Sequence, residues 1–162
     1  MKKVLVLILI LLLSACGNNR DVEYYQKVEE LQNITQSSEN IPFSIDITVN
    51  KLTDDELSYH VIIDNPLVDV RNMKVLVVHD VMTDAIFPSV GIVDESVSLT
   101  NDKDKVDLEN NIVKGIALVG YLPIDINSDI LFKILIEYLD EKNNKKTVYY
   151  VSNVTLKDIE NL

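Results

Sequence analysis

Apolar and polar residues alternate along most of the chain, and this period of two is typical of β-strands with one buried face. The clearest examples are residues 43–49 and 57–63, which flank a short polar turn and therefore predict a hairpin. The same alternation recurs at residues 73–79, 95–100, 132–138 and 148–152. Asp64-Asn65-Pro66 and Asn143-Asn144 interrupt the pattern and predict turns.

Shorter apolar runs lie between these segments, at residues 85–87, 92–93 and 106–108. Residues 112–122 are the most apolar stretch, which predicts a central strand. The chain thus carries seven to nine predicted strands, mostly separated by polar turns. Amphipathic helices of about 12 residues do not separate them, which disfavours a parallel α/β sheet. We therefore predict an all-β antiparallel sandwich.

One part of this pattern carries a resemblance. Residues 59–78 join one predicted strand to the next through Asp64-Asn65-Pro66 and Val70-Arg71-Asn72-Met73-Lys74-Val75. The segment resembles the small immunoglobulin-like domains of exported Gram-positive proteins. The resemblance implies an immunoglobulin-like sandwich and supplies no catalytic residue. The chain has one cysteine and no tryptophan, so the cysteine-tryptophan-cysteine core of antibody domains is absent and the term describes architecture alone.

The first residues follow a different pattern, that of an export signal. Lys2 and Lys3 precede an unbroken run of ten aliphatic residues, 4–13. A membrane-spanning helix needs about 20 residues. The run is therefore the length of the hydrophobic region of a signal peptide. Leu13-Ser14-Ala15-Cys16 ends the signal, and Gly17 follows it.

Leu13-Ser14-Ala15-Cys16 resembles the lipobox of bacterial lipoproteins. The resemblance implies that a diacylglycerol with chains such as palmitate is attached to the Cys16 sulfur and that the chain is cut between Ala15 and Cys16. Two long acyl chains hold a protein on a bilayer, whereas one gives only marginal binding. We therefore expect a lipid-anchored protein on the outer face of the cell membrane. A composition rich in lysine, asparagine and isoleucine favours a Gram-positive source.

These features divide the chain into three parts. Residues 1–15 are the predicted signal peptide, residues 16–40 the lipid anchor and tether, and residues 41–162 the sandwich domain. The tether has two interpretations: a spacer that lifts the domain off the lipid, which we prefer, or a partner-binding segment that presents Tyr24, Tyr25 and Val28.

A short helix is predicted within the tether. Asp21 is a suitable cap, and Tyr24, Val28 and Leu31 fall on one face of a helix that ends near Ile34. The residues that follow, 36–40, are polar and are predicted to be a linker.

Charge and cysteine content exclude several classes of partner. The formal net charge is -11, and loss of the two positive charges of Lys2 and Lys3 with the signal peptide makes it -13. Such acidity argues against binding of nucleic acid or of anionic headgroups through a basic patch. With one cysteine, the chain can form no internal disulfide.

Familiar catalytic motifs are missing from the sequence. The two histidines, His60 and His79, are expected at the surface or rim of the sheets, and the spacing of a zinc site is absent. There is no Gly-x-Ser-x-Gly or Ser-x-x-Lys motif. The four glycines are scattered, and Gly115 and Gly120 predict a bulge or close packing rather than a phosphate loop. We expect neither a cofactor nor an enzymatic activity.

One segment is rich in oxygen ligands of the kind that calcium prefers. Its acidic residues are Asp102, Asp104, Asp107 and Glu109, and Asn101 lies beside them. The segment lacks the glycine and the closing glutamate of an EF-hand, and Lys103 and Lys105 offset its charge. It is either a cation site or a solvated turn, and we favour the turn.

Seven tyrosines are the remaining candidates for a binding surface. Tyr149 and Tyr150 point to opposite faces of one strand, so one of them should face outward, where tyrosine favours contact with a partner or a glycan. The sequence therefore predicts a non-enzymatic surface lipoprotein that binds another protein at the cell envelope. The alternative is a module that binds a small ligand, a glycan or calcium.

Overall fold

The structure is a computed structural model that describes residues 19–82, 89–126 and 128–155. The lipobox with Ala15 and Cys16, and the strand predicted at residues 85–87, lie outside the described residues. The chain divides into two compact units, Met1–Glu30 and Leu31–Leu162. The second unit therefore begins about ten residues before the sandwich boundary expected at residue 41.

The described part of the first unit is helical. Helix α2 covers Asn19–Asn33, close to the helix predicted from Asp21 to Ile34, and its last three residues belong to the second unit. Tyr24 and Tyr25 meet edge to face, with ring centroids 5.3 Å apart. In the part of the chain that the structure describes, no helix combines the length and the apolar character that crossing a membrane requires.

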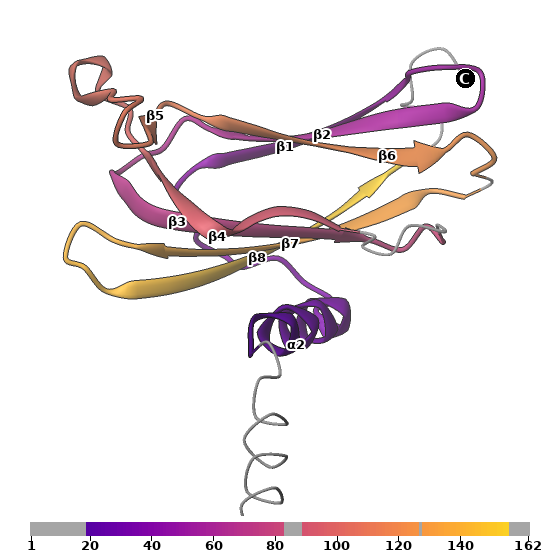
Figure 1. Cartoon of the computed structure of the whole chain (residues 1–162), viewed down its shortest axis with the longest axis horizontal. Helices are drawn as coiled ribbons and strands as arrows, with labels where there is room; N and C mark the ends of the chain where they lie inside the picture. Colours follow the sequence, from indigo (N-terminus) through magenta and orange to yellow (C-terminus); the bar gives the residue numbers. More distant parts are fainter. Residues whose placement is uncertain (1–18, 83–88, 127, 156–162) are drawn as a thin grey trace, which may run out of the picture. The chain divides into compact units, whose positions relative to one another are not determined.

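The second unit is an all-β sandwich of two sheets (Figure 1). The smaller sheet has the order β1-β2-β6 and the larger one β5-β4-β3-β7-β8. The strands are β1 (Ser44–Lys51), β2 (Glu56–Asp64), β3 (Val70–His79), β4 (Ser89–Leu99), β5 (Ile112–Val113), β6 (Ile116–Pro123), β7 (Ile130–Leu139) and β8 (Lys145–Val154). These eight strands of the described residues confirm the predicted fold class and fall within the predicted number.

Strand pairing follows the predicted alternation. The β1–β2 hairpin closes at a turn in which the backbone N–H groups of Leu52 and Thr53 both donate to the Glu56 carbonyl, at 3.0 Å each. Alternate residues of both sheets face inward and form one core, which includes Tyr59, Phe132 and Ile134. All pairings are antiparallel except the two-residue pairing of β4 with β5.

Asparagine makes the sharp turns of this fold. Asn65, Asn72, Asn111 and Asn143 have positive φ angles between 48° and 62°, and none of the glycines in the described residues does. Asparagine tolerates this left-handed conformation because its side chain can hydrogen-bond locally. Asn65 and Asn143 lie in the two turns predicted from sequence, whereas Asn72 lies where the β3–β7 register shifts.

Two predictions about strands differ from the structure. Residues 92–93 and 95–100 were expected as separate strands, but all of them except Thr100 lie in the single strand β4. The register of β4 against β3 shifts between Met73 and Val75. Residues 112–122 were expected as one central strand. They are instead interrupted near Gly115, and the main part, β6, lies at the edge of the smaller sheet. The short strand expected at 106–108 is only a bridge between Asp107 and Ile112.

The tether also differs from a free linker. The Ser38 backbone N–H donates to the Tyr149 carbonyl at 2.8 Å, and the Tyr149 N–H donates to Ser38 Oγ at 3.0 Å. The Val151 N–H donates to Ser37 Oγ at 2.9 Å. These contacts, which we call the serine clamp, satisfy backbone groups along the outer edge of β8, an edge that would otherwise invite pairing with another chain.

Close packing requires a glycine at position 120. This was one of the two roles predicted for Gly120, the other being a bulge. A Cβ atom at this position would lie 2.2 Å from Tyr59 Cζ, because the buried Tyr59 ring lies across the glycine on the neighbouring strand. We expect Gly120→Ala to lower the free energy of unfolding by about 1–3 kcal/mol, the usual cost of overpacking a core. Urea denaturation measures this loss. Ala117→Val on the exposed face of the same strand should change it little, and equal losses would contradict the packing argument.

Candidate functional site

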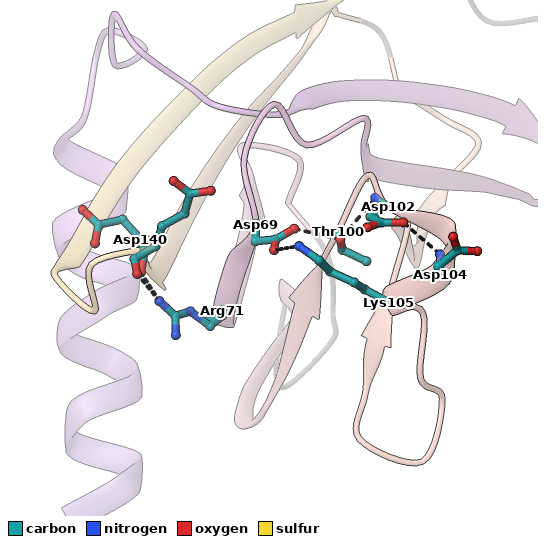
Figure 2. A network of polar contacts seen from close by, with 8 residues as sticks. Asp69, Arg71, Thr100, Asp102, Asp104, Lys105 and Asp140 are labelled. Atoms are coloured by element: carbon teal, nitrogen blue, oxygen red, sulfur yellow. Dashed lines mark hydrogen bonds and ion pairs between the residues drawn. The ribbon is translucent and has the colours of Figure 1, made fainter.

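A network of polar side chains occupies one end of the sandwich (Figure 2). Asp69, in the β2–β3 connection, accepts from Lys105 Nζ and from Thr100 Oγ1, both at 2.7 Å. Thr100 Oγ1 in turn accepts from the Asp102 N–H at 3.2 Å, and Asp102 Oδ1 accepts from the Asp104 N–H at 3.0 Å. This network ties the segment that carries the 3-10 helix η1 (Lys103–Lys105) to the start of β3.

Arg71 extends this end of the sandwich toward the β7–β8 turn. Its guanidinium donates to the carbonyls of Asp140 and Glu141 at 2.9 and 2.5 Å (Figure 2). The Asp140 carboxylate accepts from the backbone N–H groups of Lys142 and Asn144 at 2.9 and 2.8 Å. The Arg71 guanidinium and the Asp140 carboxylate therefore both hold the β7–β8 turn in place.

Hydrogen bonding favours the charged forms of Asp69 and Lys105. The hydrogen bonds from Lys105 and then Thr100 hold the pKa of the Asp69 carboxyl below its ordinary value. In turn, the hydrogen bond to Asp69 is the chief cause that raises the pKa of Lys105. A carboxylate stabilised in its charged form is a poor proton donor, so this arrangement favours a structural role over acid–base chemistry.

Thr100 is the buried centre of the network, with 2% of its surface exposed. Thr100→Val keeps the shape but removes both the hydrogen bond to Asp69 and the acceptor for the Asp102 N–H. We expect it to reduce the free energy of unfolding by about 1–2 kcal/mol, the range for a lost hydrogen bond. Thr100→Ser, which keeps the hydroxyl, should retain most of the stability in chemical denaturation. A larger loss for serine than for valine would contradict this role.

Two of the four carboxylates considered for a cation, those of Asp102 and Asp107, form local turn contacts. Asp102 caps η1, and Asp107 accepts from the N–H groups of Glu109 and Asn110 and from the Asn110 side chain. Those hydrogen bonds lower the pKa of Asp107, with Asn110 the largest cause. Among the described residues, no three His, Cys, Asp or Glu side chains are grouped as a metal site would require. Calcium binding by Asp102, Asp104, Asp107 and Glu109 gains no support from this arrangement.

The two histidines point in different directions, His60 outward and His79 toward the core. His60 on β2 pairs with Thr48 and Val119 and belongs to the outward-facing set of its strand. His79 ends β3, where its ring lies 5.7 Å from that of Tyr59 and 6.1 Å from that of Phe132. Because Tyr59 and Phe132 belong to the core, the His79 ring faces the interior of the sandwich. It does not face His60. The geometry brings together an aromatic cluster rather than a histidine pair.

His79 is a source of pH dependence. Its Nδ1 is buried without a hydrogen-bond partner among the described residues, and burial lowers its pKa from the ordinary 6.5, although the Val81 backbone and Asp80 oppose the shift. The unfolded chain therefore takes up the proton at higher pH than the folded chain. The resulting stability is full above pH 6.5 and is lost as the pH falls from there through the lowered folded-state pKa.

We expect His79→Gln to weaken this pH dependence. Urea denaturation of both proteins from pH 8 to pH 5 should show a steeper decline for the wild type than for the variant. At pH 8 the imidazole is neutral in both the folded and the unfolded state. The difference in free energy of unfolding between the two proteins at that pH therefore measures the packing lost by the substitution alone. Parallel curves would show that His79 does not contribute.

The tyrosines divide into buried and exposed groups. Tyr59 and Tyr138 are buried, and burial raises the pKa of Tyr59 to about 12. Tyr150 packs partly against the core, as expected for a sheet-face residue, and Tyr149 is also half-buried. In the second unit, the tyrosine that faces solvent is Tyr121 on β6, with 57% of its surface exposed. The apolar run 112–122 placed Tyr121 in a predicted central strand, and that prediction did not reveal its exposure.

Tyr121 belongs to a small apolar surface. Ala117, Val119 and Tyr121 alternate along β6 and are all exposed, and we call this set the β6 face. Their cross-strand neighbours on β2 are Ile62, His60 and Ser58. Exposed apolar residues gathered on one strand are a recognised sign of an interaction surface.

The β6 face and the polar network are therefore the two features from which a function can be argued. The network is occupied by contacts within the domain, while the β6 face is directed to solvent. No protein-family model matches the chain, and no curated protein or solved structure matches it significantly.

Proposed function

We propose that this chain is a surface lipoprotein, held on the outer face of the cell membrane by lipid on Cys16, whose sandwich binds another protein at the envelope without catalysing a reaction. The observation that carries the anchoring is Leu13-Ser14-Ala15-Cys16 after a ten-residue aliphatic run. The run is too short to span a bilayer, so permanent attachment requires another device. Two acyl chains on one sulfur would supply it.

The structure of α2 supports the spacer interpretation of the tether. The part of α2 that precedes the second unit, residues 19–30, is about 18 Å long at 1.5 Å per residue. This part of the helix provides a segment of defined length between Cys16 and the second unit along the chain. Val22 and Tyr25 are exposed on α2, so the helix also presents apolar side chains to solvent.

The binding role rests on the second unit. Its charged side chains at the network end are engaged in ion pairs and turn contacts, which favours a structural role for them. The β6 face, by contrast, presents Val119 and Tyr121 with 44% and 57% of their surfaces exposed. Tyrosine is enriched at protein interfaces because it combines a large apolar ring with a hydroxyl that can hydrogen-bond.

Mass spectrometry of the native protein from membranes tests the anchor. The expected N-terminal peptide begins at Cys16 and carries the mass of its acyl chains. A free Cys16 thiol, or a peptide that still contains residues 1–15, would overturn the proposal for the anchor and leave the binding role to be tested separately.

Site-specific photo-crosslinking in intact cells tests the binding role. A photoreactive residue in place of Tyr121 should give a discrete protein adduct. The same residue at Leu67, which is 80% exposed in the β2–β3 connection, is the matched control. Equal labelling at the two positions would contradict a binding surface at the β6 face.

A further inference from the structure

Strand β6 is an edge strand with unusual composition. It pairs with β2 along one side, from Ile116 to Pro123, and no backbone hydrogen bond from the described residues reaches its other side. None of its eight residues is charged, in a chain with a net charge of -11. Residues 112–122, which include most of β6, are so apolar that their sequence predicts a central strand. A central strand has a neighbouring strand on each side, whereas β6 has one among the described residues.

The other sheet edges carry some protection. The serine clamp covers part of β8, β5 pairs with Ser98 and Leu99 of β4, and the rest of β4 carries the exposed charges of Asp94 and Glu95. The edge strand β1 carries Asp46 and Lys51, and charged residues on an edge discourage pairing with another chain. In the described part of the molecule, β6 has none of these devices before Pro123 at its end.

We propose that β6 pairs antiparallel with β6 of a second copy of this chain, which joins two three-stranded sheets into one continuous six-stranded sheet. This inference rests on the binding role proposed above and names its partner, but it does not depend on the lipid anchor. Addition of a strand to an exposed sheet edge is a common mode of recognition, in which backbone hydrogen bonds supply affinity and alternate side chains supply specificity.

The charges that flank β6 favour a second copy in this orientation. Lys114 precedes the strand and Asp125 follows it, and both are exposed. When Gly120 of one copy lies opposite Gly120 of the other in an antiparallel pairing, Lys114 of each copy lies one position away from Asp125 of the other along the strand, whereas a parallel pairing would place like charges together. Between these ends the strands are neutral, so the repulsion expected between two acidic chains is least along β6.

The side chains of the β6 face are also complementary to themselves. When Gly120 of one copy lies opposite Gly120 of the other, Val119 of each copy lies opposite Tyr121 of its partner. Aromatic and β-branched residues form favourable cross-strand pairs. A two-fold axis produces this pair twice, as expected for an interface that uses the same surface on both copies.

Thiol crosslinking of the full chain in membranes tests the pairing. Cys16 is the chain's single cysteine, so the wild-type chain treated in the same way gives the background of any dimer formed through Cys16, and an introduced cysteine supplies the reactive thiol under test. With a short bifunctional maleimide, Val119→Cys should give a covalent dimer of this chain. Thr48→Cys, exposed on the opposite edge strand of the same sheet, should not.

Sedimentation of the full chain in detergent provides the second measurement. Val119→Lys should weaken dimerisation at least tenfold, while Thr48→Lys should leave it unchanged, with equal melting temperatures showing that both variants are folded. Dimers that persist in Val119→Lys, or that crosslink equally through Thr48→Cys, would overturn self-pairing through β6. Adducts of Val119→Cys with a different protein alone would also overturn it but would leave the proposed binding role intact. No adduct of either kind would overturn both.

Discussion

Replacement of Cys16 by serine is expected to abolish lipid incorporation into this protein completely. The serine hydroxyl cannot take the place of the thiol in forming the thioether to diacylglycerol, and the resemblance to lipoproteins implies that cleavage follows lipid attachment. The variant should therefore retain residues 1–15 and run as a larger species. Metabolic labelling with an alkyne fatty acid, followed by electrophoresis, measures both effects at once.

Asn18→Ser is the control for this experiment, because it makes a similarly small polar change two residues beyond the cysteine. It should be labelled and processed like the wild type. Labelling of Cys16→Ser at the wild-type level would show that the acyl chains are attached elsewhere. Loss of the lipid would also remove the membrane anchor, since two long acyl chains contribute more than about 20 kcal/mol of gross membrane affinity at about 0.8 kcal/mol per buried CH₂.

Leu31→Ala should produce the largest loss of stability among the substitutions considered. Leu31 is 0% exposed and belongs to the second compact unit, although its sequence position lies within the expected tether. Truncation of a buried leucine removes apolar contacts and leaves a cavity, which lowers the free energy of unfolding by about 2–5 kcal/mol. That is a large share of the 5–15 kcal/mol typical of a domain.

Chemical denaturation of the full chain measures this loss. Leu108→Ala is the matched control, since the same atoms are removed from a leucine that is 75% exposed. It should change the free energy of unfolding by less than about 0.5 kcal/mol. If the two variants lost equal stability, Leu31 would not be part of the folded unit.

The local pattern of the chain predicted those features that depend on near neighbours. The β1–β2 hairpin could be predicted because alternating residues and a polar turn lie together in sequence. The break at Asp64-Asn65-Pro66 was likewise predictable, since proline and asparagine act on the backbone next to them. Close packing at Gly120 was among the predictions, but the sequence did not identify Tyr59 as the residue that packs there.

Features that depend on distant residues could not be predicted in this way. The edge position of β6 follows from the order of strands in the sheet, and an apolar run has the same sequence whether it has one neighbour or two. The pairing of Lys105 with Asp69 joins residues 36 positions apart, and that of Ser37 with Val151 residues 114 apart. The sequence therefore left calcium open as the less favoured alternative to a turn in the acidic segment, because the link from Lys105 to Asp69 is not visible from the composition of the segment.

The serine clamp determines how a mechanical load would enter this molecule. A pull on the N-terminal end is transmitted along the backbone to Leu31 and then to Ser37 and Ser38 before it reaches β1. The hydrogen bonds to Tyr149 and Val151 must therefore open before the first core strand bears tension. Their rupture would lengthen the segment before β1 while β1 stays paired with β2, so the clamp would bear the first part of such a load in place of the core.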